Sequence, residues 1–322
     1  MHKRNITFLL AAGAMLILIF QGKETSKAAV MGIELCLRTV IPSLFPFFVL
    51  SGLLVGNAMS SRFLIPLGRL FRVPAGSETV LLTGLLGGYP VGAKAAAQSY
   101  AQGAISRETA NRMIGFCSQP GPGFIFGMAA SAFPSLYWGW GLWSIQLLSA
   151  WLVSRVIMPA PDEHATISSG DGFSLTEALR SALRITAEVC GWVILFRIII
   201  ALTVEQISSL PLWAGCVVSG LLELTNGCVC LKGISDTGLR FLLCSGLLSL
   251  GGCCVLMQTR SAAPGLNLSS YLRGKALQTA FSLVLSALLW RKNLPGLLFS
   301  IFFGVFWPKM QKRAGNQPRV VV

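Results

Sequence analysis

Several apolar stretches of this chain are interrupted by glycine and proline in mid-run, and this feature restricts the fold more than any other. The clearest case is residues 118–123, which read SQPGPG between the apolar runs 113–117 and 124–132. A proline in a helix interior removes an amide donor and clashes with the preceding turn, at about 3 kcal/mol. Two prolines and two glycines in succession therefore end any helix that reaches this segment.

Three further apolar runs are broken in a similar way. The run 79–86 meets GGYPVG before 93–101. The run 212–222 meets ELTNG, which begins at Glu223, and the run 241–250 meets the pair Gly251-Gly252. Two of the four breaks lie in each half of the chain, so we expect them to correspond to one another.

The composition places these runs in a membrane. Apolar residues make up 53% of the 322 residues, and Asp, Glu, Lys and Arg only 12%, about half of the ~25% that is usual in soluble domains. The net charge of +14 would suggest nucleic acid in a soluble domain. Here the basic residues flank apolar runs, so we expect a lipid bilayer and no nucleic acid as partner.

We therefore predict an all-α polytopic membrane protein with broken or re-entrant helices. Unbroken spans are expected over 5–21, 136–158, 189–204, 277–290 and 294–307, because a span needs about 20 mostly apolar residues. The first run also fits a signal peptide, although no clear cleavage site follows it. Basic residues near both ends predict cytoplasmic termini.

A polar linker divides the chain into two halves that resemble each other. Residues 44–48, 83–90 and 115–121 match 195–199, 219–226 and 246–252 in the same order. Transporters often carry such weak internal symmetry, so we predict two repeats that are inverted relative to each other. The predicted division is an N-terminal span 1–27, a first repeat with a connecting span 28–158, a linker 159–173, a second repeat 174–260, closing spans 261–308 and a basic tail 309–322.

Each half also opens with a charged, amphipathic stretch. Glu34 and Arg38 lie four residues apart, and Glu177, Arg180, Arg184 and Glu188 follow at spacings of three, four and four. Such spacing places the charges on one face of a helix. We expect these stretches to be interfacial amphipathic helices, with the charged face in water.

The four breaks predict a substrate site. Backbone groups freed at a break cannot face lipid and must line a cavity or bind a ligand. Helix N-termini attract anions, Lys94 would add a positive charge, and Glu223 is an ionisable group inside an apolar run. The predicted substrate-binding residues are Gly87, Gly88, Tyr89, Pro90, Gly92, Lys94, Ser118, Gln119, Gly121, Glu223, Thr225, Asn226, Ser249, Gly251, Gly252 and Gln258.

Plainer interpretations stand beside these assignments. Glycine and proline also serve packing and kinking in membrane helices, and Lys94 could extend to a lipid headgroup. The nine cysteines form no C-x-x-C pair and lie mostly in apolar runs, so we interpret them as small buried residues. With two histidines and no Walker A sequence, we expect no enzyme, no metal and no cofactor.

Two motifs resemble those of a known family. GGYPVGAK at 87–94 and PGPGFIFG at 120–127, with Gly251-Gly252 and Gln258 further on, resemble the sporulation integral membrane protein YlbJ family, also called SpoVV, of the nucleoside-recognition Gate domain group. The resemblance covers roughly residues 31–271. Cys117-Ser118-Gln119 and Leu250 depart from the family pattern, which leaves the substrate open.

The resemblance implies two Gate-type repeats and a role in endospore formation. It implies that dipicolinate, a small aromatic dianion, moves across the outer forespore membrane from mother cell to forespore. A membrane scaffold for spore-envelope assembly that does not transport, and a nucleoside transporter, are the alternatives. The driving force and a homo-oligomeric state stay open.

Overall fold

The computed structural model describes residues 12–13, 15–16, 18–56, 63–158 and 174–291, and over these residues it is helical without strands. The all-α prediction is therefore confirmed for the described part of the chain. The predicted span 294–307, the linker 159–173, the tail 309–322 and most of the span 5–21 lie outside the described residues.

The first half consists of short and long helices in a fixed order. These are α2 (Gly22–Leu35), the π-helical η1 (Cys36–Val40), α3 (Ile41–Gly56), α4 (Ile65–Phe71), α5 (Glu78–Gly87), α6 (Val91–Ala101), α7 (Arg107–Cys117), α8 (Pro122–Gly127), the 3-10 turn η2 (Ala129–Ala132) and α9 (Tyr137–Ile157).

The second half follows a similar order. It consists of α10 (Leu175–Leu202), α11 (Val204–Ser208), α12 (Leu212–Leu222), α13 (Leu224–Cys230), the 3-10 turn η3 (Leu231–Gly233), α14 (Thr237–Leu250), α15 (Gly252–Ala262) and α16 (Leu268–Arg291). Each half thus runs from a long helix through a short one, a helical hairpin and a broken helix to another long helix. This parallel supports a duplication, while the inversion stays a prediction.

All four predicted breaks separate helices, and each has a local cause. Gly88 (φ 83°) and the cis bond between Tyr89 and Pro90 separate α5 from α6. Residues 118–121 separate α7 from α8, which starts at Pro122. Glu223 is extended between α12 and α13, and Gly251 is left-handed between α14 and α15.

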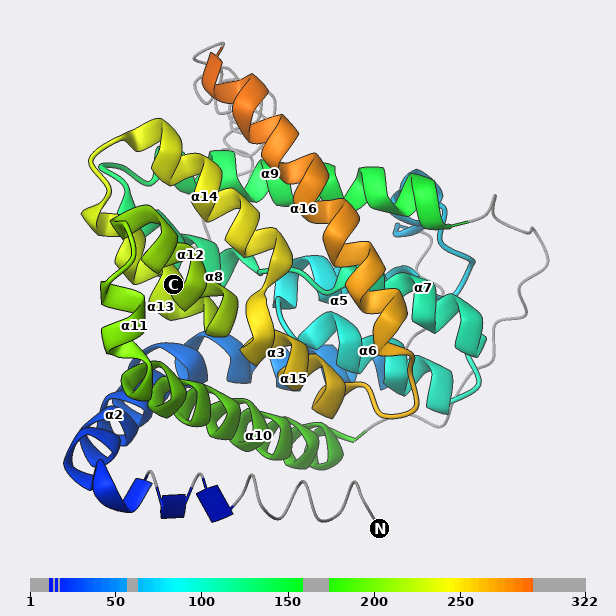
Figure 1. Cartoon of the computed structure of the whole chain (residues 1–322). Helices are drawn as coiled ribbons and strands as arrows, with labels where there is room; N and C mark the ends of the chain where they lie inside the picture. Colours follow the sequence, from blue (N-terminus) through cyan, green and yellow to red (C-terminus); the bar gives the residue numbers. More distant parts are fainter. Residues whose placement is uncertain (1–11, 14, 17, 57–62, 159–173, 292–322) are drawn as a thin grey trace, which may run out of the picture.

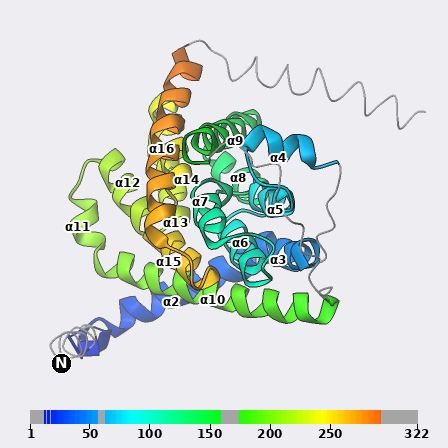
Figure 2. The same ribbon diagram turned by 90° about the vertical axis from the view of Figure 1, so that its right-hand side faces the viewer.

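The long helices enclose the broken ones. Figure 1 shows α10 beside α2 and α3 along one side of the molecule and α9 along the opposite side. Figure 2, turned by 90°, shows α14 and α16 running together between these two sides. With 10 and 11 residues, α5 and α12 are about 15–17 Å long, half of a ~30 Å hydrocarbon layer. The breaks that follow them therefore fall inside the molecule.

Three described helical stretches are long and apolar enough to cross a membrane: Gly22–Val55, Leu175–Leu202 and Thr237–Ala262. The interfacial position of the two charged stretches stays a prediction. Glu34 and Arg38 lie within the first stretch, and the charged stripe Glu177–Glu188 is the first part of the continuous helix α10. The predicted spans 136–158 and 277–290 are helical as α9 and as part of α16.

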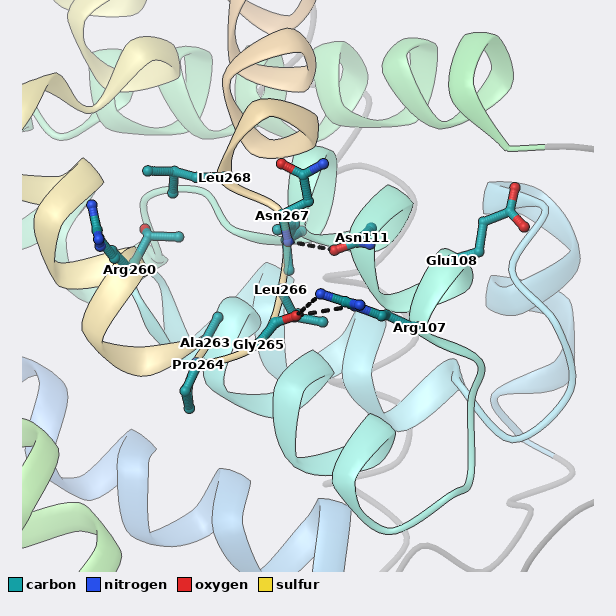
Figure 3. Close-up of a pocket in the computed structure, with 12 residues that line it drawn as sticks. Arg107, Glu108, Asn111, Arg260, Ala263, Pro264, Gly265, Leu266, Asn267 and Leu268 are labelled. Atoms are coloured by element: carbon teal, nitrogen blue, oxygen red, sulfur yellow. Dashed lines mark hydrogen bonds between the residues drawn. The ribbon is translucent and has the colours of Figure 1, made fainter.

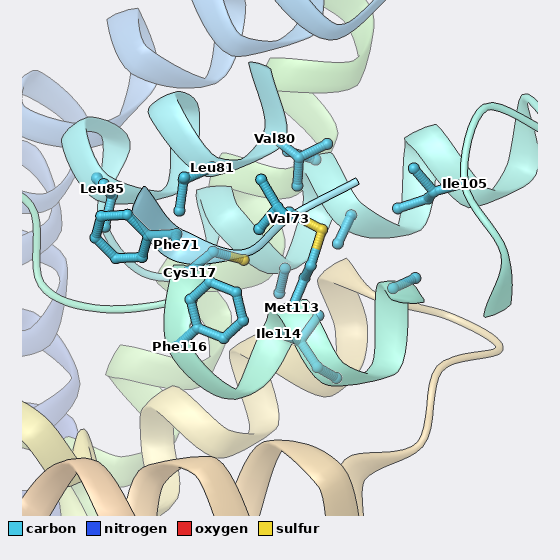
Figure 4. Packing of buried hydrophobic residues seen from close by; sticks show 14 of the residues in the cluster. Phe71, Val73, Val80, Leu81, Leu85, Ile105, Met113, Ile114, Phe116 and Cys117 are labelled. Atoms are coloured by element: carbon cyan, nitrogen blue, oxygen red, sulfur yellow. The ribbon is translucent and has the colours of Figure 1, made fainter. Parts of the chain in front are cut away.

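Packing in the interior relies on small and apolar side chains. Figure 4 shows the cluster to which α5 and α7 contribute side chains, in which Phe71 stacks on Phe116 at 6.2 Å between ring centroids. Most described cysteines are buried and free, as predicted, but Cys216 and Cys230 form a disulfide that joins α12 to α13. The sequence interpretation missed this pair because its partners come together only when the hairpin folds.

Candidate functional site

Three of the breaks, together with α15 beyond the fourth, line one small, partly enclosed cavity of about 50 Å³. The long helices close its other side through residues such as Ser43 of α3 and Val189 of α10. Segments far apart in sequence thus enclose a single space. The lining residues contributed by the breaks and by α15 are Gly87, Gly88, Tyr89, Pro120, Gly121, Glu223, Leu224, Thr225, Val255 and Gln258.

The breaks approach each other so closely that only glycine fits at the crossings. A Cβ on Gly88 would lie 2.7 Å from the amide nitrogen of Gly121, which joins the first break to the second. A Cβ on Gly252 would lie 2.5 Å from the carbonyl oxygen of Gly220, which joins the fourth break to α12. Gly88, Gly121 and Gly252 were predicted as site residues. The structure places each of them at a contact between two backbone segments.

Glu223 is the only acidic residue that lines the cavity, and it also caps a helix. Its two carboxylate oxygens accept hydrogen bonds from the amides of Thr225 (2.9 Å) and Asn226 (2.8 Å), and its side chain is buried. An N-cap of this kind satisfies amides that have no partner inside the helix. The sequence identified the residue correctly as buried and polar, and the structure adds this capping role.

Tyr89 connects the cavity to the fourth break. Its ring lines the cavity, and its hydroxyl lies 3.1 Å from the carbonyl oxygen of Leu248 and 3.2 Å from that of Ser249, at the end of α14. A side chain of the first half therefore stabilises the broken helix of the second half.

Lys94 does not reach the cavity. Its ammonium lies 5.7 Å from the centre of the Phe48 ring, is buried, and has no hydrogen-bond partner among the described residues. The cation–π contact with Phe48 satisfies part of its charge. The sequence placed Lys94 near the break correctly, but it could not say toward which side of α6 the chain points.

The remaining predicted residues surround the cavity without lining it. Pro90 and Gly92 start α6, and the Asn226 amide nitrogen is bound to Glu223. The side-chain donors of Ser118, Gln119 and Asn226 are buried and have no partner among the described residues. The hydroxyl of Ser249 donates to Oε1 of Gln146 (3.0 Å).

The structure reveals a buried cation that the sequence interpretation missed. Lys275 of α16 is fully buried, and its ammonium donates to the hydroxyl of Tyr89 (3.1 Å) and to Oε1 of Gln278 (2.6 Å). Gln278 in turn donates to Oε1 of Gln119 (3.2 Å), beside the second break. Lys275 thus contacts Tyr89, which lines the cavity, but it does not line the cavity itself.

A sequence signal for this residue exists. Lys275, Gln278, Ser282 and Ser286 follow at spacings of three, four and four, and all four are buried. This is the pattern of one helix face. The expected span began at residue 277, which left the lysine outside it and hid the pattern.

The polar face of α16 meets polar groups of two other long helices. The hydroxyls of Ser245 in α14 and Ser282 in α16 lie 2.6 Å apart, and Nε2 of Gln146 in α9 donates to the carbonyl oxygen of Ser245 (3.2 Å). Hydrogen bonds between helices replace the hydrophobic driving force that is missing inside a membrane.

A second, open pocket of about 890 Å³ lies at one end of the molecule, between α7 and the loop from α15 to α16. Figure 3 shows Arg107 reaching across it to the carbonyl oxygen of Gly265, at 2.9 and 3.1 Å, and Oδ1 of Asn111 accepting from the amide of Asn267. Thr259 also lines this pocket, one residue along α15 from Gln258 in the small cavity.

Long apolar helices and helix breaks buried against protein define a multi-pass integral membrane protein. Over 144 residues the chain is 35% identical to the sporulation integral membrane protein YlbJ of Bacillus subtilis (strain 168). This match confirms the resemblance to the YlbJ-like family, and it covers 41% of this chain and 35% of YlbJ.

No protein-family profile matches the chain. No solved structure matches it either. Within the described residues there is no group of three His, Cys, Asp or Glu that could hold a metal ion.

Proposed function

We propose that this protein has a membrane role in sporulation and is a secondary transporter or facilitator for a small organic anion. The observation that carries the proposal is the meeting of breaks from both halves around one small cavity that is lined by Glu223, a design that suits binding near the membrane midplane. The substrate we propose is dipicolinate, moved across the outer forespore membrane from mother cell to forespore. The two halves would then act as Gate-type repeats.

The cavity has the features of an occluded site. Its volume of about 50 Å³ is well below the roughly 300–1,000 Å³ of ligand pockets. Dipicolinate therefore enters only when the surrounding helices separate. In each of the hairpins α5–α6 and α12–α13, the break between the two helices lies at the cavity. We expect these hairpins to move when the cavity opens. A closed state of this kind is one of the states that alternating access requires.

The test is uptake of dipicolinate by purified protein in proteoliposomes, with and without an imposed proton or sodium gradient. We expect wild-type protein to accumulate dipicolinate and Glu223→Gln to lose most of this uptake. The glutamine side chain keeps one acceptor oxygen for the cap. It cannot bind the backbone amides of Thr225 and Asn226 through two separate oxygens, and it has no carboxyl proton to gain or lose. Glu205→Gln, an exposed acid in α11, is the matched control.

Three outcomes would redirect the proposal. Wild-type uptake by Glu223→Gln protein removes Glu223 from the transport site. A wild-type protein that neither takes up dipicolinate nor gains thermal stability from it favours the envelope scaffold. Competition by uridine for the same binding would favour a nucleoside transporter.

A further inference from the structure

Lys275 is a buried cation without a buried counter-charge. Both of its hydrogen-bond acceptors, the Tyr89 hydroxyl and Oε1 of Gln278, are neutral. The ion pairs among the described residues, Arg112–Glu108 and Arg184–Glu188, do not involve it. An unpaired ammonium inside a protein costs several kcal/mol. Such a residue in a membrane interior is expensive and marks a functional position by default.

The small cavity needs a positive charge that its own lining does not supply. Its lining residues include one carboxylate, Glu223, but no lysine or arginine. A dianion that entered this space would meet the Glu223 carboxylate, and a buried anion needs a partner. Tyr89 connects the cavity to Lys275, since it lines the cavity and its hydroxyl accepts from Lys275.

Further donors near Lys275 have no acceptor. The buried Nε2 of Gln119 and the buried hydroxyl of Ser118 are both without a partner among the described residues, and Gln119 is linked to Lys275 through Gln278. Unsatisfied buried donors are rare, and each asks for an explanation. An ammonium, an amide and a hydroxyl that all lack an acidic acceptor form the donor set that a carboxylate binds.

A series of neighbouring side chains also connects Lys275 to the open pocket. Thr259 lines that pocket, and its buried hydroxyl lies beside that of Tyr271 without meeting hydrogen-bond geometry. The Tyr271 ring in turn lies 5.8 Å from the Lys275 ammonium. Two tyrosines thus flank Lys275, one toward the small cavity and one toward the arginine-bearing pocket of Figure 3.

We propose that Lys275 is a carboxylate-binding subsite for the transported anion, halfway between the open pocket and the small cavity. A carboxylate displaces the Tyr89 hydroxyl from Lys275 and receives hydrogen bonds from Lys275, Gln119 and Ser118. Tyr89 and Tyr271 then act as the side chains that open and close the two approaches. This inference rests on the proposed transport of an organic anion and names the group that recognises its charge.

The experiment measures equilibrium binding to purified protein in detergent for two ligands of the same shape. Dipicolinate carries two carboxylates, and pyridine-2,6-dicarboxamide is its neutral analogue. We expect the wild type to prefer the dianion, and Lys275→Met to lose about tenfold to a hundredfold in dipicolinate affinity, as expected for a lost hydrogen bond to a charged group. Affinity for the diamide should change little, whereas a merely structural defect would weaken both ligands equally.

Lys232→Met, at an exposed lysine of η3, is the control and should keep the wild-type preference. The inference is overturned if Lys275→Met keeps the wild-type preference for the dianion, or if the wild type does not prefer the dianion. If proteoliposome uptake is normal in that case, the proposed function still stands. If the preference for the dianion depends on Lys275 but the protein takes up no dipicolinate, the carboxylate-binding subsite is supported and the proposed transport is contradicted. If the wild type binds neither ligand, both proposals fail.

Discussion

At the scale of single residues, positive φ angles fix the fourth break. Gly251 and Gly252 have φ values of 81° and 76°, in the left-handed region that non-glycine residues avoid. The second of them also faces the backbone of α12. The pair therefore ends α14, starts α15 and lets the breaks of the second half approach each other.

We expect Gly252→Ala to lower thermal stability more than Gly265→Ala does. Both glycines have positive φ (76° and 81°), so both variants carry ~1–2 kcal/mol of left-handed strain. At Gly265 a Cβ meets nothing within 4 Å, but at Gly252 it meets two carbonyl groups of α12, which adds ~1–3 kcal/mol. Thermal unfolding of the two purified variants in detergent compares them, and equal midpoints would contradict this account.

The sequence predicted site residues well where the signal was local. Clusters of glycine and proline interrupt helices, so residues 88, 121 and 251 could be placed at breaks without a structure. The direction in which the Lys94 side chain points depends on the orientation of α6 relative to α3, which is a tertiary property. The sequence analysis missed Lys275 for another reason. The mean hydropathy of a segment shows how apolar it is, but it does not show on which helix face a single charged residue lies.

At the scale of helices, α7 and α16 cross where neither has a side chain. A Cβ on Gly274 would overlap the backbone of Gly115. Small residues at a crossing allow membrane helices to approach closely. Because Gly274 precedes Lys275 in α16, this crossing also positions the buried lysine.

We expect Gly274→Ala to separate α7 from α16 and to destabilise the protein by ~1–3 kcal/mol, the usual range for overpacking. Gly191→Ala is the control, because Gly191 lies in α10 with nothing within 4 Å of its added Cβ. Alanine is the better helix former by up to ~1 kcal/mol, so this control should unfold at the wild-type temperature or slightly above. A Gly274→Ala protein as stable as the wild type would argue against a close crossing.

The element order shows what local signals can supply and what they cannot. Four breaks, α9 and the helical class followed from Gly, Pro and hydropathy. The charged stretch at 177–188 was expected to lie flat in the interface. In the structure it forms one continuous helix, α10, with an apolar part, and this helix is long and apolar enough to cross a membrane. Amphipathic spacing alone does not distinguish these two outcomes.

At the scale of the whole molecule, charge is distributed unevenly between the two ends. The start of α7 and the end of α9 lie at the right of Figure 1, and α4 lies beside α9, where Arg72 donates to the carbonyl oxygen of Arg155. This end carries Arg69, Arg72, Arg107, Arg112 and Arg155. By the positive-inside rule we expect it to face the cytoplasm.

Cysteine labelling tests this orientation. In a Cys253→Ser background, we expect Glu108→Cys to react with a membrane-impermeant maleimide only after the cells are permeabilised. Lys232→Cys, an exposed position in η3 of the second half, should react in intact cells. Permeabilised cells labelled at both positions provide the control, and the reverse pattern in intact cells would invert the orientation.

The polar face of α16 also has a consequence for biogenesis. Translocon scales assign a lysine near a helix centre about +2.5 to +3.5 kcal/mol, and α16 adds Gln278, Ser282 and Ser286 on the same face. It is absent from the three stretches apolar enough to enter a bilayer by composition. We therefore expect the helix that holds the buried lysine to need polar partners in α9 and α14 during insertion, so that the site forms only when these three helices come together.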